Sequence, residues 1–277
     1  MNHDHGTLEE LEDLLKLSGG MVISYSGGLD SAFLACVAHE VTGGQEHCVI
    51  LDSPLVPRRT IKEAKDRADS FGIPCEVVPF PILEDEEFLK NPASRCYLCK
   101  KRGALILRKK AKEYGLGEVM DGVNYSDYQE YRPGIKASDE EGITHPLALC
   151  RLTKPVIREL AKERAYPFWD LPSSPCLATR IPYGDEISIP DLKRIEEAEE
   201  FLVCAGFPIV RVRVHRDLAR IEVPGDDIAS LFENRDSITK KMRELGFFYC
   251  TVDLEGFRSG SMDREILPGG RTSGRKT

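Results

Sequence analysis

Short runs of consecutive apolar residues alternate, over most of the chain, with segments whose apolar residues recur every three or four positions. The runs are typical of strands buried on both faces, and the recurring segments of amphipathic helices. The runs predict strands over 21–25, 48–52, 75–80 and 119–121. Helices are predicted from the capping-box sequence at residue 7 and over 29–37, 57–72, 100–114 and 156–164. This alternation predicts an α/β fold, a doubly wound parallel sheet whose ligand loops follow the carboxyl ends of its strands.

The pattern changes near residue 185. The later elements are a long charged helix, two strands, a helical stretch and a last strand, over 189–205, 210–215, 218–223, 226–245 and 247–254. This order predicts a smaller α+β domain of the split βαβ type. We therefore predict one domain over 1–184, a second over 185–260, and a disordered Gly/Arg/Ser-rich tail over 261–277.

Two connections interrupt the pattern. The polar segment 124–142 contains Tyr125, Tyr128 and Tyr131, and we predict that it is an ordered active-site loop. The Pro-rich passage 167–183 holds Cys176 where neither helical nor strand periodicity is evident, and loops of this kind commonly form sites.

The composition limits the possible functions. With 46 acidic and 38 basic residues in 277, the chain has a net charge of −8, which argues against a general nucleic-acid binder. No apolar run reaches the length of a bilayer span, and the first residues lack the pattern of a signal peptide, so a cytoplasmic protein without a membrane partner is predicted. In a reducing cytosol its nine cysteines are expected to be thiols, metal ligands or reactive groups rather than a disulfide framework.

A turn rich in serine and glycine, here called the 26–31 turn, joins the first predicted strand to the next helix. Gly27 and Gly28 let a ligand approach the backbone, and the free N–H groups of the helix favour an anion such as phosphate. The turn matches neither the Walker A loop nor the G-x-G-x-x-G motif. Ser-Gly-Gly alone would fit an ordinary turn, but the full string Ser-Gly-Gly-Leu-Asp-Ser resembles the SGG-x-DS signature of the PP-loop ATP pyrophosphatases. The resemblance implies binding of the ATP pyrophosphate and adenylation of a substrate.

Cys96 and Cys99 form a C-x-x-C pair at the start of the predicted helix 100–114. Half a zinc site, a redox pair and part of an iron–sulfur site all have this spacing. The sequence contains no second C-x-x-C or His-x-x-His for structural zinc, and no thioredoxin-like context. Cys176 is the best candidate for a third ligand, and three cysteines suit a [4Fe–4S] cluster whose open iron carries an extra sulfide. The others are expected to be small buried hydrophobes: Cys36, Cys48, Cys75, Cys150, Cys204 and Cys250.

Motifs along nearly the whole chain resemble the LarE family. They are the 26–31 turn and the strings Leu51-Asp52-Ser53-Pro54, Asp121-Gly122-Val123-Asn124, Pro175 to Gly184, and Arg211-Val212-Arg213. Members of this family are ATP-dependent sulfur transferases of nickel-pincer nucleotide biosynthesis, which supplies the cofactor of lactate racemase. They adenylate a carboxylate of pyridinium-3,5-biscarboxylic acid mononucleotide and replace the adenylate with sulfur, which gives a thiocarboxylate.

The resemblance implies one of two sulfur sources. In one branch of the family a single cysteine at the position of Cys176 gives up its own sulfur and is left as dehydroalanine. In the other branch that cysteine joins a C-x-x-C pair to hold a [4Fe–4S] cluster that carries the sulfide. Cys96 and Cys99 are typical of the second branch, and the sacrificial reaction is the alternative.

The resemblance also implies roles for individual residues. The ATP-binding residues are expected to be Ser24, Ser26, Gly27, Gly28, Leu29, Asp30 and Ser31, with Ser53 and Gly122 lining the nucleotide pocket. Asp30 is also expected to reach Mg²⁺, which stabilises the charge that develops on pyrophosphate. The expected catalytic residues are Cys176, Asp30, Arg180 and Lys101; for Lys101, as for its neighbour Lys100, a solvated helix face is an equally good explanation.

Arg211 and Arg213 alternate on one predicted strand, so both side chains point to one face, as phosphate binding by guanidinium groups requires. The family resemblance places the substrate phosphate there, although an exposed basic strand face explains the pattern nearly as well. Glu199 and Glu222 are candidates for metal or subunit contacts, and the resemblance implies a homohexamer. Trp169 is expected to have a packing role.

Three other functions stay open from the sequence. Some PP-loop enzymes with three cysteines and a cluster thiolate tRNA, but the net charge of −8 and the lack of an RNA-binding module in the sequence count against this function. An amidotransferase- or NAD synthetase-like ligase would need ammonia and none of the three cysteines. A non-catalytic nucleotide-binding module would not convert ATP. The main hypothesis predicts two partners, a small nucleotide substrate and a sulfide source.

Overall fold

The computed structural model describes residues 7–129, 132–172 and 175–258, and these residues form two compact units. The first unit comprises 7–82 and 94–172, and the second comprises 83–93 and 175–258. This division places Cys176 in the second unit. The domain roles predicted for 1–184 and 185–260 stay a prediction, and the predicted tail 261–277 lies outside the described residues.

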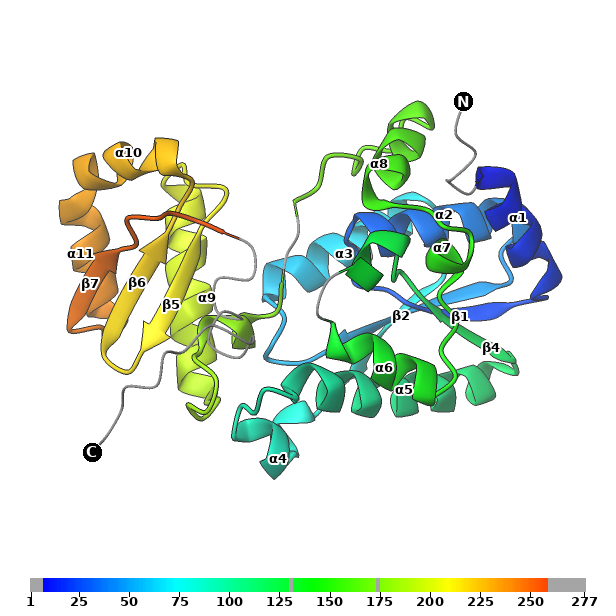
Figure 1. Cartoon of the computed structure of the whole chain (residues 1–277), viewed down its shortest axis with the longest axis horizontal. Helices are drawn as coiled ribbons and strands as arrows, with labels where there is room; N and C mark the ends of the chain where they lie inside the picture. The colour runs from blue at the N-terminus through cyan, green and yellow to red at the C-terminus, as the bar shows by residue number, and fades with distance from the viewer. Residues whose placement is uncertain (1–6, 130–131, 173–174, 259–277) are drawn as a thin grey trace. The chain divides into compact units, whose positions relative to one another are not determined.

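Four parallel strands form the sheet of the first unit, in the order β3-β2-β1-β4 (Figure 1). They are β1 (Met21–Ser24), β2 (Glu46–Asp52), β3 (Cys75–Pro79) and β4 (Glu118–Asp121). Ser24, the last residue of β1, pairs with Val49 of β2 and with Asp121, the last residue of β4. The predicted α/β fold with a parallel sheet is confirmed, and the segments that follow β1 and β4 meet at one edge of it.

Helices cover both faces of this sheet. One core cluster takes residues from α1 (Leu8–Leu17), α2 (Leu29–Thr42), α3 (Arg58–Ser70) and α8 (Lys154–Glu163), and another from α5 (Arg95–Tyr114). Alternate residues of β1 enter the two clusters, Ile23 the first and Val22 the second. The predicted capping box is confirmed, because Thr7 and Glu10 each accept the backbone N–H of the other.

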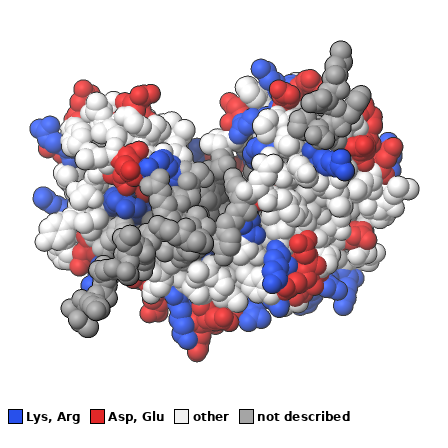
Figure 2. Space-filling model, in the orientation of Figure 1, with Lys and Arg blue, Asp and Glu red and all other residues white. Residues whose placement is uncertain are grey.

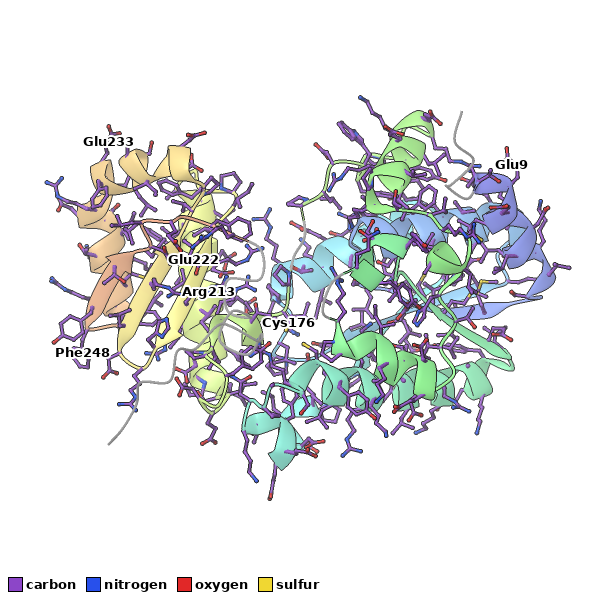
Figure 3. All side chains as sticks on the ribbon, in the orientation of Figure 1. Glu9, Cys176, Arg213, Glu222, Glu233 and Phe248 are labelled. Atoms are coloured by element: carbon purple, nitrogen blue, oxygen red, sulfur yellow. The ribbon has the colours of Figure 1, made fainter. Side chains whose placement is uncertain are left out.

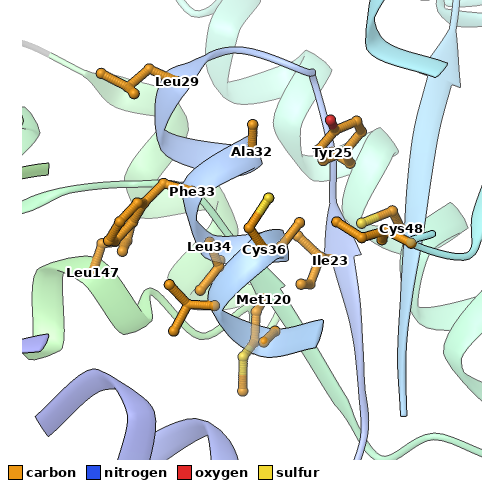
Figure 4. Packing of buried hydrophobic residues seen from close by; sticks show 14 of the residues in the cluster. Ile23, Tyr25, Leu29, Ala32, Phe33, Leu34, Cys36, Cys48, Met120 and Leu147 are labelled. Atoms are coloured by element: carbon orange, nitrogen blue, oxygen red, sulfur yellow. The ribbon is translucent and has the colours of Figure 1, made fainter. Parts of the chain in front are cut away.

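The helix α2 is buried along most of its length. In Figure 4 its residues Phe33, Leu34 and Cys36 lie among other buried side chains, including Ile23 of β1 and Met120 of β4. A helix that is apolar on all sides belongs in a core. Truncation of a fully buried leucine such as Leu34 to alanine costs about 2–5 kcal/mol. The core therefore holds the start of α2, and with it the 26–31 turn, in one position.

Segment 124–142 is not the loop that the sequence predicted. It contains η2 (Tyr125–Gln129) and α6 (Pro133–Glu140), and α7 (Pro146–Leu149) follows it. Pro133 stands at the first position of α6, where its fixed φ favours a helix. Gly134 packs so closely on α5 that a Cβ there would lie 2.9 Å from Lys100 Cγ. The prediction was wrong because contact with α5 stabilises this short polar helix, and sequence periodicity does not report such a contact.

The second unit contains a three-stranded mixed sheet in the order β5-β6-β7. Its strands are β5 (Arg211–His215), β6 (Leu218–Glu222) and β7 (Tyr249–Val252), and its helices are α4 (Glu86–Leu89), α9 (Ile189–Cys204), α10 (Ile228–Glu233) and α11 (Arg235–Glu244). Short turns of 3-10 helix in this unit are η3 (Leu177–Arg180) and η4 (Gly225–Asp227), and η1 (Ile82–Glu84) begins on the last residue of segment 7–82 and continues into the second unit. The predicted α+β organisation is confirmed, although Asn234 interrupts the helical stretch predicted over 226–245.

The cysteines predicted to be buried differ in exposure. Cys36, Cys48 and Cys150 are buried, Cys75 and Cys250 are partly buried, and Cys204 is exposed. The prediction for Cys204 was wrong because this residue is the last of α9, where the helix leaves the core.

No helix in the described part of the chain is both long and apolar enough to cross a membrane. On the face shown in Figure 2, acidic and basic side chains are interspersed. The cytoplasmic location stays a prediction.

Candidate functional site

The 26–31 turn is closed by its own two serines. The hydroxyl groups of Ser26 and Ser31 lie 3.1 Å apart, and the Ser26 N–H donates to Ser31 Oγ at 3.3 Å. Ser31 Oγ also lies 3.2 Å from the Gly28 carbonyl oxygen, to which it donates. These bonds hold the turn against the first residues of α2, whose first N–H groups have no acceptor within the helix. The turn therefore offers serine hydroxyls, backbone N–H groups and the positive end of a helix to an anion.

Two glycines of this region stand where a side chain could not fit. Gly27 has φ +72°, and a Cβ there would lie 2.3 Å from Ala64 Cβ on α3. Gly122 follows β4, and a Cβ there would lie 2.8 Å from the Ser31 nitrogen and 3.1 Å from the Asp30 carbonyl carbon. Arg67 of α3 also donates to the Gly27 carbonyl. The turn is thus enclosed by α3 on one side and by the residue after β4 on the other.

Asp30 lies on the first turn of α2 and has two partners from distant parts of the chain. Lys154, the first residue of α8, forms an ion pair with its carboxylate. Asn124 Nδ2 donates to Asp30 Oδ1 at 3.4 Å. The Asp30 side chain is 20% exposed and that of Lys154 is 30% exposed, so ligands in solution can reach both. A carboxylate and an ammonium group therefore stand together beside the anion site.

The other predicted nucleotide residues belong to the same unit. Ser24 ends β1, and Ser53 is buried directly after β2. The side chain of Leu29 is 2% exposed and lies in the core, so only its backbone can serve a nucleotide.

A buried charge network lies behind Gly122. His145 Nδ1 and Asp121 Oδ1 are 2.6 Å apart, and Lys100 Nζ lies 3.5 Å from Asp121 Oδ2. Burial raises the pKa of Asp121, but Lys100 and His145 outweigh it and the pKa is lowered. Burial opposes protonation of His145, but the hydrogen bond to Asp121 and the carboxylates of Asp121 and Asp139 outweigh it, so the pKa of His145 is raised. Both shifts favour the charged forms of Asp121 and His145, and the ion pair of Asp121 with Lys100 links β4 to α5, the helix that carries the C-x-x-C pair.

Cys96 and Cys99 lie three residues apart in the first half of α5 and are partly buried. Two residues at this spacing lie on one face of a helix. Lys101 contacts Tyr97, whose hydroxyl donates to Glu140 of α6 at 2.5 Å, and the bond to Tyr97 raises the pKa of Lys101. Within the described ranges no group of three His, Cys, Asp or Glu side chains forms a metal site. Two of the three predicted cluster ligands are thus brought together in the first unit, and the third, Cys176, belongs to the second.

Cys176 immediately precedes η3, and Arg180 holds the chain around it. The Arg180 guanidinium donates to the carbonyls of Pro175 at 2.8 Å and Cys176 at 3.0 Å. On its other side it forms two bonds of 2.8 Å with the Glu199 carboxylate of α9. The Arg180 side chain is 2% exposed, so this pair is a fixed part of the second unit that positions the Cys176 backbone.

The basic strand β5 faces the same network. Arg213 is buried, and it pairs with Glu222 of β6 at 2.7 Å and donates to the Thr179 carbonyl at 2.8 Å. Figure 3 shows Arg213 and Glu222 together on the sheet. Burial, and then the nearby charge of Arg180, lower the pKa of Arg211 to about 10. Burial and a neighbouring positive charge destabilise the charged form of this guanidinium, and a bound anion would stabilise it. Glu199 and Glu222, predicted as metal or subunit contacts, are arginine partners here.

Comparison with known proteins identifies the family. No protein-family model matches the chain. The chain is 36% identical over 262 residues to an uncharacterized protein of Synechocystis sp., and the match covers 93% of this chain and 98% of the relative. An uncharacterized protein of Methanocaldococcus jannaschii is 35% identical over 258 residues, or 90% and 98% of the two chains. The pyridinium-3,5-bisthiocarboxylic acid mononucleotide synthase of Lactiplantibacillus plantarum is 32% identical over 254 residues, 91% of each chain. The chain belongs to the LarE family.

A weaker similarity connects this LarE chain to other PP-loop proteins. One chain of the glutamine-hydrolyzing GMP synthase of Thermoplasma volcanium is 25% identical over 179 residues, 60% of this chain and 58% of the relative. This similarity supports the PP-loop relationship of the chain, and together with the parallel sheet it confirms the predicted α/β fold.

Two functional candidates in this LarE chain were missed by sequence reasoning. Lys154 is 124 residues from its partner Asp30, and His145 is 24 residues from Asp121. Lys154 lies just before the helix predicted over 156–164, and its local pattern does not distinguish it from an ordinary residue at a helix start. One signal available in the sequence was Asn124, which follows the predicted strand 119–121 inside a family motif and in the structure donates to Asp30.

Proposed function

We propose that this chain is an ATP-dependent sulfur transferase that adenylates a carboxylate of pyridinium-3,5-biscarboxylic acid mononucleotide and converts it to a thiocarboxylate. The observation that carries the proposal is the 26–31 turn, an anion site closed by Ser26 and Ser31 and bordered by Gly122, in a chain that aligns with 91% of a named synthase. The PP-loop relatives support the use of ATP.

The reaction has two steps, adenylation of the carboxylate and displacement of AMP by sulfur. A carboxylate oxygen of the substrate attacks the α-phosphorus of ATP, and the bond to the β-phosphate oxygen breaks with its electron pair, which releases pyrophosphate. A hydrosulfide then attacks the acyl carbon, AMP leaves, and the thiocarboxylate remains. In the first step the N–H groups at the start of α2 and the hydroxyls of Ser26 and Ser31 bind the phosphates. Asp30 would hold Mg²⁺, which would stabilise the charge that develops on pyrophosphate.

The sulfur source in this proposal is a [4Fe–4S] cluster held by Cys96, Cys99 and Cys176. The donor set fits the group, because thiolates are its ligands and the C-x-x-C pair has the required spacing. A bound cluster would supply the sulfide that displaces AMP. Arg180 positions the Cys176 backbone, and Lys101 stands on the helix of the other two cysteines. Donation of sulfur from Cys176 itself is the competing source.

The substrate phosphate in this proposal binds at Arg211 and Arg213. The lowered pKa of Arg211 supports an anion-binding surface on β5, whereas Arg213 already pairs with the buried Glu222 and would contribute positive charge from behind that surface. The reaction also needs a sulfide source and, by analogy with the family, takes place in a homohexamer.

The experiment uses the full chain, purified anaerobically, with ATP, sulfide and pyridinium-3,5-biscarboxylic acid mononucleotide, followed by mass spectrometry. We expect AMP, pyrophosphate and a thiocarboxylate product in equal amounts, and a brown protein. Cys96→Ser and Cys176→Ser lose the product, whereas the control Cys204→Ser, at an exposed helix end, keeps it.

The other sulfur source gives a different pattern. If Cys96→Ser keeps one turnover and Cys176 loses the mass of one hydrogen sulfide, sulfur comes from Cys176 and the cluster is refuted. AMP formation that depends on ammonia would contradict sulfur transfer as a whole. So would thiolation of tRNA without conversion of the mononucleotide.

A further inference from the structure

One peptide unit of the 26–31 turn, between Gly27 and Gly28, is held by a residue of another element. The Gly27 carbonyl accepts a hydrogen bond from the Arg67 guanidinium of α3. A trans peptide points its C=O and its N–H in opposite directions, and no peptide bond among the described residues is cis. The Gly28 N–H therefore points away from Arg67, and it donates to Ser26 Oγ at 3.4 Å. The N–H thus faces a hydroxyl that the proposed function assigns to the phosphates.

Two adjacent glycines would otherwise let this peptide turn over. Gly27 has φ +72° and Gly28 has φ −71°. Glycine adopts φ of either sign at little cost, so rotation of the peptide by half a turn meets no Cβ of either residue. In the flipped form the Gly27 carbonyl, with its partial negative charge, would point to the side of Ser26 Oγ and repel a phosphate. The orientation that suits an anion therefore depends on what binds this carbonyl.

The core fixes the position from which Arg67 reaches the turn. The Arg67 guanidinium carbon lies 5.9 Å from the centre of the Phe168 ring, which is 1% exposed. Ala64 and Ala68 of the same helix are buried. A Cβ at Gly27 would lie 2.3 Å from Ala64 Cβ and 3.2 Å from Arg67 Nη1, so the helix and the turn are in close contact. Arg67 is therefore a fixed neighbour of the Gly27 carbonyl.

The charge of Arg67 adds to its role as a donor. A hydrogen bond from a charged donor is about twice as strong as one between neutral groups. Burial raises the pKa of Tyr25, the residue before the turn, and the nearby charge of Arg67 opposes this rise, so the charge acts at the base of the turn. A positive charge behind a peptide whose N–H faces an anion favours binding of that anion.

We propose that Arg67 is a positioning residue for ATP binding, which holds the peptide between Gly27 and Gly28 so that the Gly28 N–H faces the phosphates. This inference rests on the proposed function and adds a residue to its phosphate site. Arg67 acts through the peptide and is not itself a ligand of the nucleotide. Its hydrogen bond to the carbonyl excludes the flipped form.

An arginine that only joined α3 to the rest of the first unit would have different consequences. Its loss would weaken binding of every ligand of the unit, with or without phosphates. Positioning of one peptide predicts a loss confined to ligands that carry phosphates. It also predicts that a second change which prevents the flip restores their affinity.

Gly28→Ala is such a second change. A flipped peptide moves the φ of residue 28 by half a turn, to a positive value that alanine disfavours. The present φ of −71° suits alanine, and the nearest atom to the new Cβ would be Ser26 Oγ at 3.5 Å, an ordinary contact. The variant therefore keeps the observed orientation without help from Arg67.

The test measures binding of ATP, inorganic pyrophosphate and adenosine to the full chain by calorimetry in magnesium buffer. For Arg67→Met we expect ATP and pyrophosphate affinity to fall about tenfold, the equivalent of one hydrogen bond from a charged group, with adenosine affinity within about twofold of wild type. Arg67→Lys keeps a charged donor and recovers most of the loss. The matched control is Lys65→Met, which removes the same charge from an exposed pair with Asp69 on the same helix and binds all three ligands as wild type does.

The combination with Gly28→Ala decides between positioning and a general structural role. Relative to Gly28→Ala alone, we expect the double variant Gly28→Ala/Arg67→Met to lose less than about threefold in ATP affinity. The same loss in both backgrounds overturns the assignment. An unchanged ATP affinity in Arg67→Met, or a loss of adenosine affinity equal to that of ATP, also overturns it.

The binding measurements need no acceptor. A wild-type protein that binds ATP but does not convert the mononucleotide refutes the proposed function while the role of Arg67 is still decided. Thermal unfolding of each variant shows that the proteins compared are folded.

Discussion

A methyl group added at Gly122 tests whether contact between β4 and α2 shapes the nucleotide site. In Gly122→Ala the new Cβ would lie 2.8 Å from the Ser31 nitrogen, 3.0 Å from Ser31 Cα and 3.1 Å from the Asp30 carbonyl carbon. Favourable separations are about 3.5–4.0 Å, so β4 and the start of α2 must separate by about 0.7 Å to relieve the shortest of these contacts. All three atoms are backbone, and neither element can yield by a change of rotamer.

The expected cost is about 1–3 kcal/mol of the free energy of unfolding, as for other overpacked sites. The separation also displaces Ser31, so ATP affinity falls by about tenfold or more if ~1.4 kcal/mol of binding energy is lost. Urea titration gives the stability, and calorimetry gives the ATP affinity. Gly117→Ala is the matched control, because this glycine precedes the same strand and its Cβ would meet no atom within 4 Å.

A Gly122→Ala protein with the stability and ATP affinity of the Gly117→Ala control would refute the reasoning. An intermediate case is Gly134→Ala, whose new Cβ meets Lys100 Cγ at 2.9 Å. That atom belongs to a flexible side chain and can move, so we expect a smaller cost than for Gly122→Ala.

Three other changes test the charges and thiols. Arg213→Met leaves Glu222 in a buried site with one partner fewer. We expect urea titration to show a loss of about 3–5 kcal/mol in the free energy of unfolding. The control Lys193→Met removes one partner of an exposed ion pair and changes the free energy of unfolding by under ~1 kcal/mol. His145→Gln removes a group whose pKa is raised in the folded protein. The stabilisation that His145 gives to the free energy of unfolding is fully present below about pH 6.5 and is lost as pH rises through the folded pKa. Urea titration over this pH range should show the difference between variant and wild type shrinking, and a difference that stays constant with pH would contradict the network. In the native protein at pH 8, exposed Cys204 reacts with a disulfide reagent, while Cys36, whose pKa burial raises to about 12, reacts only on unfolding; equal rates would refute the burial assignment.

The sequence predicted the inner strands of the first unit's sheet because β1, β2 and β4 are largely buried. Met21, Val22 and Ile23 are fully buried, and such strands appear as continuous apolar runs. The 26–31 turn was predictable because its backbone makes close approaches that only glycine permits. Gly27 has a positive φ and faces Ala64 at a distance that excludes a side chain.

The partners of the site residues were not predictable in the same way. The ion pair of Asp30 with Lys154, and the pair of Asp121 with His145, join residues on different elements. Local patterns carry no information about such pairs, because each residue taken alone fits an ordinary helix or loop. The helix α6 was missed for the same reason, since its stability depends on contact with α5.

The most direct test of the account is the fate of the mononucleotide carboxylate. Anaerobic full-length protein is supplied with ATP, sulfide and pyridinium-3,5-biscarboxylic acid mononucleotide, and the products are followed by mass spectrometry. The account predicts one AMP and one pyrophosphate for each thiocarboxylate formed, with no product from Cys176→Ser. Thiocarboxylate formation without ATP cleavage, or ATP cleavage to AMP without any thiocarboxylate, would contradict it.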